Sequence, residues 1–395
     1  MTLRIHFGQS LFVIALLLAT TVLMPKTSAA GPAPKQMLVY IGTYTEHGSK
    51  GIYAYHFDSS TGKLTSLGLA SETAAPSFLA VTREGKFLYA VNELQKYDGQ
   101  PTGAVSAFAI DQTSGKLSLL NQLASRGQDP AHVVVDRTGK YALVANYTSG
   151  SVAVFPILKD GRLGEATSFV QHKGHGVNPD RQEGPHAHCI AMSPDNRFAI
   201  VADLGLDQLL VYAFDAAKGT LGPNPQIVKT APGAGPRHLV FSSDGRFFYV
   251  LTEMQSTVVT YSYDSATGSL HELQSLSALP KNFSGESTGA EVEIDPSGKF
   301  LFASNRPSNP LGGSIAVFAI HPRAGTLTPI EIDSSGGNTP RNFTLDPSGS
   351  WLLAANEDSG NIVVFRLDRK TGHLTPTGES VQLSSPVCVK FVVPQ

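Results

Sequence analysis

The sequence has little of several features that would define other classes of protein. Only two cysteines occur in 395 residues, which excludes a disulfide scaffold and a zinc site built from cysteines. The 30 Lys and Arg residues against 32 Asp and Glu residues give a net charge of −2, and no basic cluster is present, which argues against a nucleic-acid-binding face. The sequence also has no Gly-x-Ser-x-Gly nucleophile elbow and no phosphate-binding or dinucleotide-binding glycine loop in a strand-to-helix context.

The longest apolar run is too short for a membrane span. Leu11–Met24 is an uncharged apolar run of 14 residues, whereas a spanning helix needs ~20. Arg4 precedes the run, Pro25 ends it and small residues lead to Ala30, which is the plan of a secretory signal peptide. We therefore predict a signal peptide at residues 1–30, cleaved near Ala30, and a periplasmic or secreted protein without stable membrane insertion. A retained membrane anchor is the alternative.

Turn residues and an internal repeat dominate the rest of the chain. Gly (38) and Pro (25) together make about one residue in six, which argues against a helical bundle. An apolar run, an Asp/Ser-x-x-Gly-like turn, Lys or Arg, an aromatic residue and a second apolar run recur six times, at spacings of 49 to 57 residues. The turn residues are Gly85, Gly139, Asn196, Gly245, Gly298 and Gly349. A Gly-x-Leu motif occurs seven times, beginning at Gly62, Gly115, Gly161, Gly219, Gly268, Gly325 and Gly372.

One further repeat is split between the two ends of the chain. Pro386–Val392 corresponds to the first half of a copy, and Met37–Tyr44 corresponds to the second half. Each repeat contains four short β-rich runs bounded by turns. We therefore predict an all-β protein, a seven-bladed β-propeller over residues 37–395, closed by its C-terminal strand and preceded by a linker at 31–36. The WD40 class is excluded, because its Trp-Asp signature is absent and the chain has one Trp.

The propeller topology predicts which side chains meet. Both turn motifs lie on one face, so the starts of the innermost strands and the ends of the second strands share the opposite face, near the channel. Eight positions before the turn residue stand Ser77, Ala131, His188, Arg237, Ala290 and Arg341, and seven before stand Phe78, His132, Cys189, His238, Glu291 and Asn342. Eight positions after it stand Glu93, Tyr147, Leu204, Glu253, Arg306 and Glu357. A solvated channel entrance is one explanation for these polar residues, and a binding site is the other.

Several motifs in this ring resemble those of a known family. They are QEGPHAH at 182–188, GPRH at 235–238, Glu253, Ala290–Glu291, SNR at 304–306, PRN at 340–342 and ANE at 355–357. Over residues 37–395 the chain resembles the seven-bladed-propeller lactonases, typified by bacterial 6-phosphogluconolactonase of the propeller type. The resemblance implies a hydrolase that opens a sugar-type lactone. The export signal departs from this pattern, because 6-phosphogluconolactone is made in the cytoplasm.

Two other functions stay open beside hydrolysis. A fungal lactone-forming muconate cycloisomerase shares the fold and is similar at the His, Arg and Glu positions, so family resemblance does not fix the reaction. A non-catalytic propeller that binds a carbohydrate or a protein on the same face is the third hypothesis. The ring of His, Arg and Glu favours an enzyme, because a docking platform would expose aromatic anchors.

Lactone hydrolysis needs a base for the attacking water and donors for the tetrahedral oxyanion. We expect His188 or Glu253 to be the general base and Arg237 to stabilise the oxyanion. The expected substrate contacts are His186, Arg306, Arg341, Asn342 and Glu291. The structural alternatives are a strand-end histidine bonded to a neighbouring loop for His188, and an ion pair with one of the arginines for Glu253.

No cofactor is expected from the sequence, and a divalent metal is the alternative. Histidines at 172, 175, 186 and 188 are close in sequence, but their separations fit no common zinc motif. The expected partner is a small-molecule lactone, and we expect a monomer. Cys189 and Cys388 lie near the starts of innermost strands in well-separated blades, which predicts two free thiols.

Overall fold

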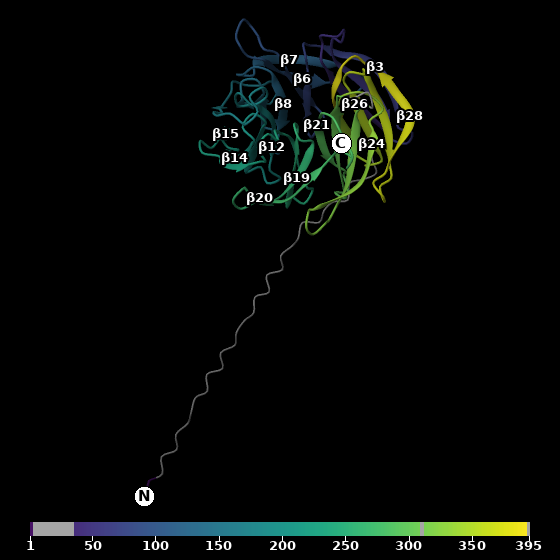
Figure 1. The fold of residues 1–395 in the computed structure, drawn as a ribbon. Coiled ribbons are helices and arrows are strands. Elements are labelled where there is room, and N and C mark those ends of the chain that lie inside the picture. The colour runs from purple at the N-terminus through teal and green to yellow at the C-terminus, as the bar shows by residue number, and fades with distance from the viewer. Residues whose placement is uncertain (3–34, 309–311, 393–395) are drawn as a thin grey trace. The chain divides into compact units, whose positions relative to one another are not determined.

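The computed structural model describes residues 1–2, 35–308 and 312–392. The chain divides into two units, residues 1–32 and residues 33–395, and the second unit is the propeller. From residue 3 onward, the predicted signal peptide lies outside the described residues. The described strands form seven antiparallel sheets that are arranged radially (Figure 1). Within the described ranges, no helix is long and apolar enough to cross a membrane.

Each sheet is one blade, whose strands follow one another from the channel outward. The first three blades are β29 (Pro386–Val392), β1 (Gln36–Thr43), β2 (Gly51–Asp58), β3 (Lys63–Glu72); β4 (Phe78–Val81), β5 (Phe87–Asn92), β6 (Ala104–Ile110), β7 (Leu117–Ala124); and β8 (Pro130–Val135), β9 (Tyr141–Asn146), β10 (Ser151–Pro156), β11 (Ser168–Gln171). The fourth is β12 (Ala187–Met192), β13 (Phe198–Asp203) and β14 (Gln208–Asp215), with β15 (Thr220–Leu221) and β16 (Gln226–Lys229) both on β14. The fifth is β17 (Pro236–Phe241), β18 (Phe247–Thr252), β19 (Thr257–Asp264) and β20 (Ser269–Ser277). The last two are β21 (Ser287–Ile294), β22 (Phe300–Pro307), β23 (Ser314–Ile320), β24 (Leu327–Ser334) and β25 (Pro340–Leu345), β26 (Trp351–Asn356), β27 (Asn361–Leu367), β28 (Leu374–Gln382).

The repeated turn connects the first two strands of a blade. In the third blade, Asp136 Oδ1 accepts hydrogen bonds from the backbone N of Lys140 (2.7 Å) and Tyr141 (2.9 Å), which closes the turn between β8 and β9. The turn residue has a left-handed conformation in all six copies. The copy in the fourth blade uses Asn196, with φ of 61°, and Asn is one of the few non-glycine residues that adopt this conformation readily.

The hydrophobic core lies between neighbouring blades. Trp351 of the last blade packs edge-on against Phe57 of the first, with ring centroids 6.4 Å apart, and its Nε1 donates to Ser59 O at 2.8 Å. In Figure 1 the outer strands β3 and β28 lie side by side at this junction, and they are in contact. Blade-to-blade packing of this kind buries the apolar side chains of each sheet on its neighbours.

Both ends of the propeller complete the same blade. β29 pairs antiparallel with β1, from Val392 opposite Leu38 to Pro386 opposite Thr43. This confirms the predicted seven-bladed architecture and its split blade. The innermost strands contact one another in a closed circle around the channel.

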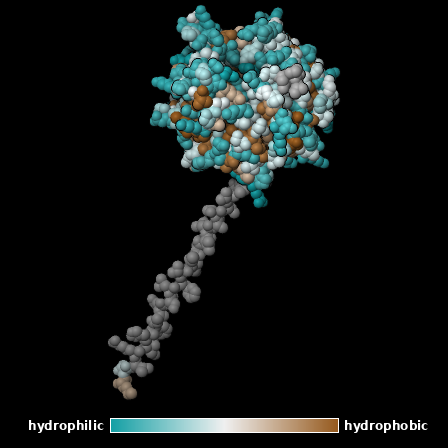
Figure 2. Space-filling view, viewed as in Figure 1, coloured by the Kyte–Doolittle hydropathy of each residue, from teal (hydrophilic) through white to brown (hydrophobic). Residues whose placement is uncertain are grey.

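Few large apolar side chains are exposed among the described residues. Figure 2 shows a surface that is mainly polar, with apolar residues scattered among polar ones. Cys189 and Cys388 are buried and free, as predicted. The polar residues of the channel and its mouth are therefore the candidates for function.

Candidate active site

A bulge near the start of the innermost strand directs side chains into the channel mouth. Ala187 and Cys189 of β12 pair with consecutive residues of β13, so His188 is the extra residue between them. Arg237 of β17 and Arg341 of β25 occupy the same kind of irregularity. A bulge re-aims a side chain out of the alternating strand pattern. The three side chains line one pocket.

This pocket has a volume of about 270 Å³ and a polar lining. Its residues are Glu93, Ala131, Tyr147, Arg181, His188, Arg237, Glu253, Arg306 and Arg341. Five of the predicted site residues are therefore together in one pocket, namely His188, Arg237, Glu253, Arg306 and Arg341. Glu93 and Tyr147 come directly after β5 and β9, the same position that Glu253 occupies after β18.

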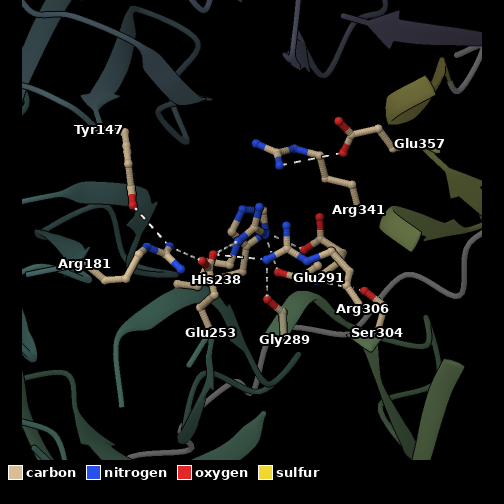
Figure 3. Close-up of polar contacts among 12 residues, drawn as sticks. Tyr147, Arg181, His238, Glu253, Gly289, Glu291, Ser304, Arg306, Arg341 and Glu357 are labelled. Carbon is tan, nitrogen blue, oxygen red and sulfur yellow. Dashed lines mark hydrogen bonds and ion pairs between the residues drawn. The ribbon is translucent and has the colours of Figure 1, made fainter. Parts of the chain in front are cut away.

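Glu253 is the centre of an ion-pair network with three arginines. Its Oε2 accepts from Arg237 Nε at 2.8 Å and lies 3.1 Å from Arg306 Nη2, and its Oε1 accepts from Arg181 Nη2 at 2.5 Å. Burial alone would raise the pKa of this carboxyl, but the three guanidinium charges outweigh it and hold the pKa well below its usual range. Glu253 is therefore an ionised but weak base. In Figure 3, Arg181 lies between Tyr147 and Glu253.

The second ion-pair group of the pocket surrounds Arg341. Its Nη1 lies 3.8 Å from Glu357 (Figure 3). Its Nη2 lies 3.8 Å from Glu93, and its guanidinium stands over the Tyr44 ring at 5.0 Å. The network as a whole contains four arginines (181, 237, 306, 341) and three glutamates (93, 253, 357), which leaves one positive charge in excess when all are ionised. The pocket can therefore accept a developing negative charge.

His188 is the pocket residue best placed to accept a proton. Its side chain is buried, and its Nδ1 has no hydrogen-bond partner within the described residues. The ring stands edge-on to Tyr147, at 5.4 Å between centroids, and to His238, at 5.2 Å. Burial, followed by the charge of Arg237, holds the pKa of His188 well below its ordinary value. The imidazole is therefore neutral at neutral pH and can act as a base.

The loop between β11 and β12 supplies one wall of the pocket. Asp203, at the end of β13, accepts from His186 N at 2.8 Å and pairs with His172 Nδ1 at 2.6 Å, which fixes both ends of the loop. The loop carries Arg181, which sequence reasoning missed because the loop belongs to no repeat position. Its place directly before the QEGPHAH motif was the one available signal.

His186 packs against Tyr147, a residue that lines the pocket. Its ring stacks on Tyr147, with centroids 4.7 Å apart and planes at 18°, and its Nδ1 lies 3.2 Å from Tyr147 O. His186 is not among the lining residues, so its effect on the pocket passes through Tyr147. A direct contact between His186 and substrate stays a prediction.

Glu291 and Asn342 lie below this pocket. Glu291 Oε1 is 2.8 Å from His238 Nδ1, and its Oε2 accepts from Asn342 Nδ2. Asn342 Oδ1 in turn accepts from Val389 N at 2.8 Å. Glu291 lines a separate cavity in the channel, so the substrate contacts expected of these two residues stay predictions.

This fold and this pocket define a class of propeller enzyme, and the chain belongs to the lactonase family. Residues 38–391 match the family described as "Lactonase, 7-bladed beta-propeller". The chain is a 6-phosphogluconolactonase-like lactonase: the 6-phosphogluconolactonase of Bacillus subtilis is 38% identical over 353 residues, which are 89% of this chain and 97% of that protein. The 6-phosphogluconolactonase of Formosa agariphila is 34% identical, over 85% of this chain and 94% of its own.

A solved structure gives a related comparison. The periplasmic gluconolactonase of Pseudomonas aeruginosa is 33% identical and superimposes with a TM-score of 0.84. The alignment covers 91% of this chain and all of that one (100%).

Proposed function

We propose that this lactonase opens a sugar-type lactone by adding water, with His188 as the general base. The observation that carries the proposal is a neutral, uncommitted imidazole in a pocket whose four arginines are ordered by carboxylates. The sequence left the base open between His188 and Glu253. Both carboxylate oxygens of Glu253 are engaged by arginines, whereas Nδ1 of His188 has no partner among the described residues, and this difference favours His188.

The reaction then follows from the geometry. His188 takes a proton from water as the water oxygen attacks the carbonyl carbon, and the carbonyl oxygen becomes an oxyanion. Arg237 uses its Nε for Glu253 and its Nη1 for Ala290 O (2.5 Å), which leaves Nη2 to stabilise the oxyanion together with Arg306. The ring C–O bond breaks, the ring oxygen takes the proton from His188, and the new carboxylic acid ionises. Glu253 holds the guanidiniums in place throughout.

The substrate is, in this proposal, a non-phosphorylated aldonolactone outside the cytoplasm. Glu93, Glu357 and Arg341 offer acceptors and donors suited to hydroxyl groups, and the single excess positive charge is small for a phosphate dianion.

The apolar run at Leu11–Met24 supports export, as does the name of the P. aeruginosa relative, a periplasmic gluconolactonase. N-terminal sequencing of protein exported by its host should give a start near residue 31, and an intact Met1 in the membrane fraction would contradict export.

A lactone panel tests the reaction. Gluconolactone, 6-phosphogluconolactone and muconolactone are titrated in a pH-stat with the full chain, with and without a chelator. We expect gluconolactone to be the best substrate, and His188→Gln to lose ~10²–10⁴-fold in kcat. His132→Gln, which replaces an imidazole outside the pocket, is the matched control and should retain activity. Turnover of muconolactone alone would favour the cycloisomerase, and no turnover would favour the binding module.

A further inference from the structure

Three cavities follow one another along the propeller axis. The pocket is the first, and the third is a channel cavity of about 410 Å³ lined along β4, β8, β17 and β21 as far as Val81, Val135, Val240 and Ile294, near the turn face. Between them lies a cavity of about 10 Å³. It shares His188 and Arg237 with the pocket, and Phe78 and His238 with the channel. A polar space of this size holds about one water molecule.

Titratable side chains connect the three cavities. His188 borders both the pocket and the small cavity, and its buried Nδ1 is without a partner among the described residues. His238 borders the small cavity and the channel, with its ring centroid 5.2 Å from that of His188. Its Nδ1 is bonded to Glu291, which faces the channel (Figure 3). Each residue thus reaches the next directly or through one water.

We propose that the floor of the pocket is a proton exit, in which the proton released by each lactone opening leaves through His188, one water, His238 and Glu291 into the channel and so to the opposite face. The proposal rests on the hydrolytic function proposed above. It gives a function to a buried histidine–carboxylate pair that lies outside the lining of the pocket. The mouth of the pocket can then be filled by substrate or product while the proton leaves from below.

The proton balance is simple. Lactone and water give a hydroxy acid, and ionisation of that acid releases one proton per turnover to His188. His188 passes it to the water in the small cavity, the water protonates His238 Nε2, and His238 gives up its Nδ1 proton to Glu291. Glu291 then releases a proton to channel water and returns to the carboxylate. No oxidant, reductant or further reactant is needed.

The surroundings of Glu291 suit an intermediate proton carrier. The groups that face it are His238 and Arg237 from β17, His132 from β8, Cys189 from β12, Lys390 from β29 and Glu293 on its own strand. Burial raises the pKa of Glu291 to about 7, against the charges of Lys390 and Arg237. Because Glu291 must be ionised to receive a proton, kcat should fall as the pH drops below about 7.

Two variants and an unbuffered assay test the exit. Glu291→Gln and His238→Gln each remove one step, and lactone opening is followed in a pH-stat in unbuffered salt solution. We expect kcat to fall ~10-fold or more, with kcat/KM largely kept because ring opening precedes proton release. Added imidazole should restore kcat by carrying the proton through the mouth. Glu291→Gln should also lose the fall in kcat below neutral pH.

His132→Gln is the matched control. His132 lines the same channel cavity, with its ring centroid 5.6 Å from that of His238, but does not border the small cavity. It should keep wild-type kcat in the unbuffered assay. Wild-type kcat in both exit variants, or a loss that imidazole does not repair, overturns the exit while leaving hydrolysis standing. A wild-type chain that opens no lactone overturns both proposals.

Discussion

At the scale of single residues, Glu253 allows three guanidiniums to share a small pocket. Glu253→Gln would leave Arg181, Arg237 and Arg306 without their common counter-charge. We expect kcat/KM to fall ~10²–10³-fold as the oxyanion donors move apart. Breaking a buried ion pair from one side should also cost ~3–5 kcal/mol in the free energy of unfolding. Lactone kinetics and urea denaturation measure the two effects.

A surface change provides the control for Glu253. Glu272→Gln removes the same charge from an exposed position on β20 and should alter neither the lactone kinetics nor the free energy of unfolding.

The stability of the fold should also depend on pH through Glu253. The folded pKa of Glu253 lies below its unfolded value, so its ion pairs stabilise the fold above pH ~4.3 and lose this effect as the pH falls toward the folded pKa. Glu253→Gln should therefore reduce the loss of stability in acid. Equal acid sensitivity in wild type and variant would contradict the network.

The protonation of His188 sets a second expectation. Burial and the charge of Arg237 hold the pKa of His188 well below 6.5, so its imidazole stays neutral at neutral pH. The imidazole becomes protonated, and can no longer act as a base, only in more acidic solution. The acid limb of kcat/KM should therefore lie well below pH 6.5 and disappear in the residual activity of His188→Gln. The pH dependence of kcat/KM across the acid range measures this. An acid limb at the ordinary histidine pKa would show that His188 is not the base.

At the scale of strands, the repeat predicted which positions share a face, but not which side chains enter the pocket. Positions eight and seven before the turn are neighbours along one strand. The bulge sends His188, Arg237 and Arg341 into the pocket, while Glu291 and Asn342, one position further on, lie below it. A bulge depends on pairing with the next strand, so an alternating apolar pattern does not reveal it.

The junction of the first and last blades yields a prediction at this scale. Trp351 is 4% exposed, and a Cβ added at Gly62 would lie 2.6 Å from its ring, so the indole fills its site closely. Trp351→Ala should destabilise the propeller by ~3–5 kcal/mol through lost burial and the remaining cavity. Trp351→Phe keeps a ring and should cost less. Urea denaturation of both variants tests this, and equal losses would contradict a packing role.

At the scale of the whole molecule, nearly all of the architecture could be predicted, since each blade repeats the same turn chemistry and the split repeat identifies the closing strand. The predicted strand Pro386–Val392 has the same bounds as β29. Arg181 could not be predicted, because it reaches Glu253 across 72 residues of sequence from a loop with no counterpart in other blades. Long-range ion pairs of this kind leave no periodic signal.

Ring closure gives the final prediction. Deleting residues 384–395 removes β29 and exposes unpaired edges on β1, so the chain should unfold or aggregate. Deleting 393–395 alone leaves β29 in place and serves as the control. Thermal melting and size-exclusion chromatography compare the two. A 384–395 deletion that melts like the full chain would contradict closure.

The pairing of β29 with β1 also bears on how the chain reaches its native state. β1 is the first strand of the propeller in sequence and β29 is the last, so their pairing is the most non-local contact between strands in this fold. Non-local pairings of this kind slow folding, because the chain loses the entropy of closing a long loop before the stabilising contacts between the strands have formed. During synthesis the first blade stays incomplete until β29 has been made. The nascent propeller therefore keeps an open edge for the whole time it is being made, which is when it depends most on protection from aggregation.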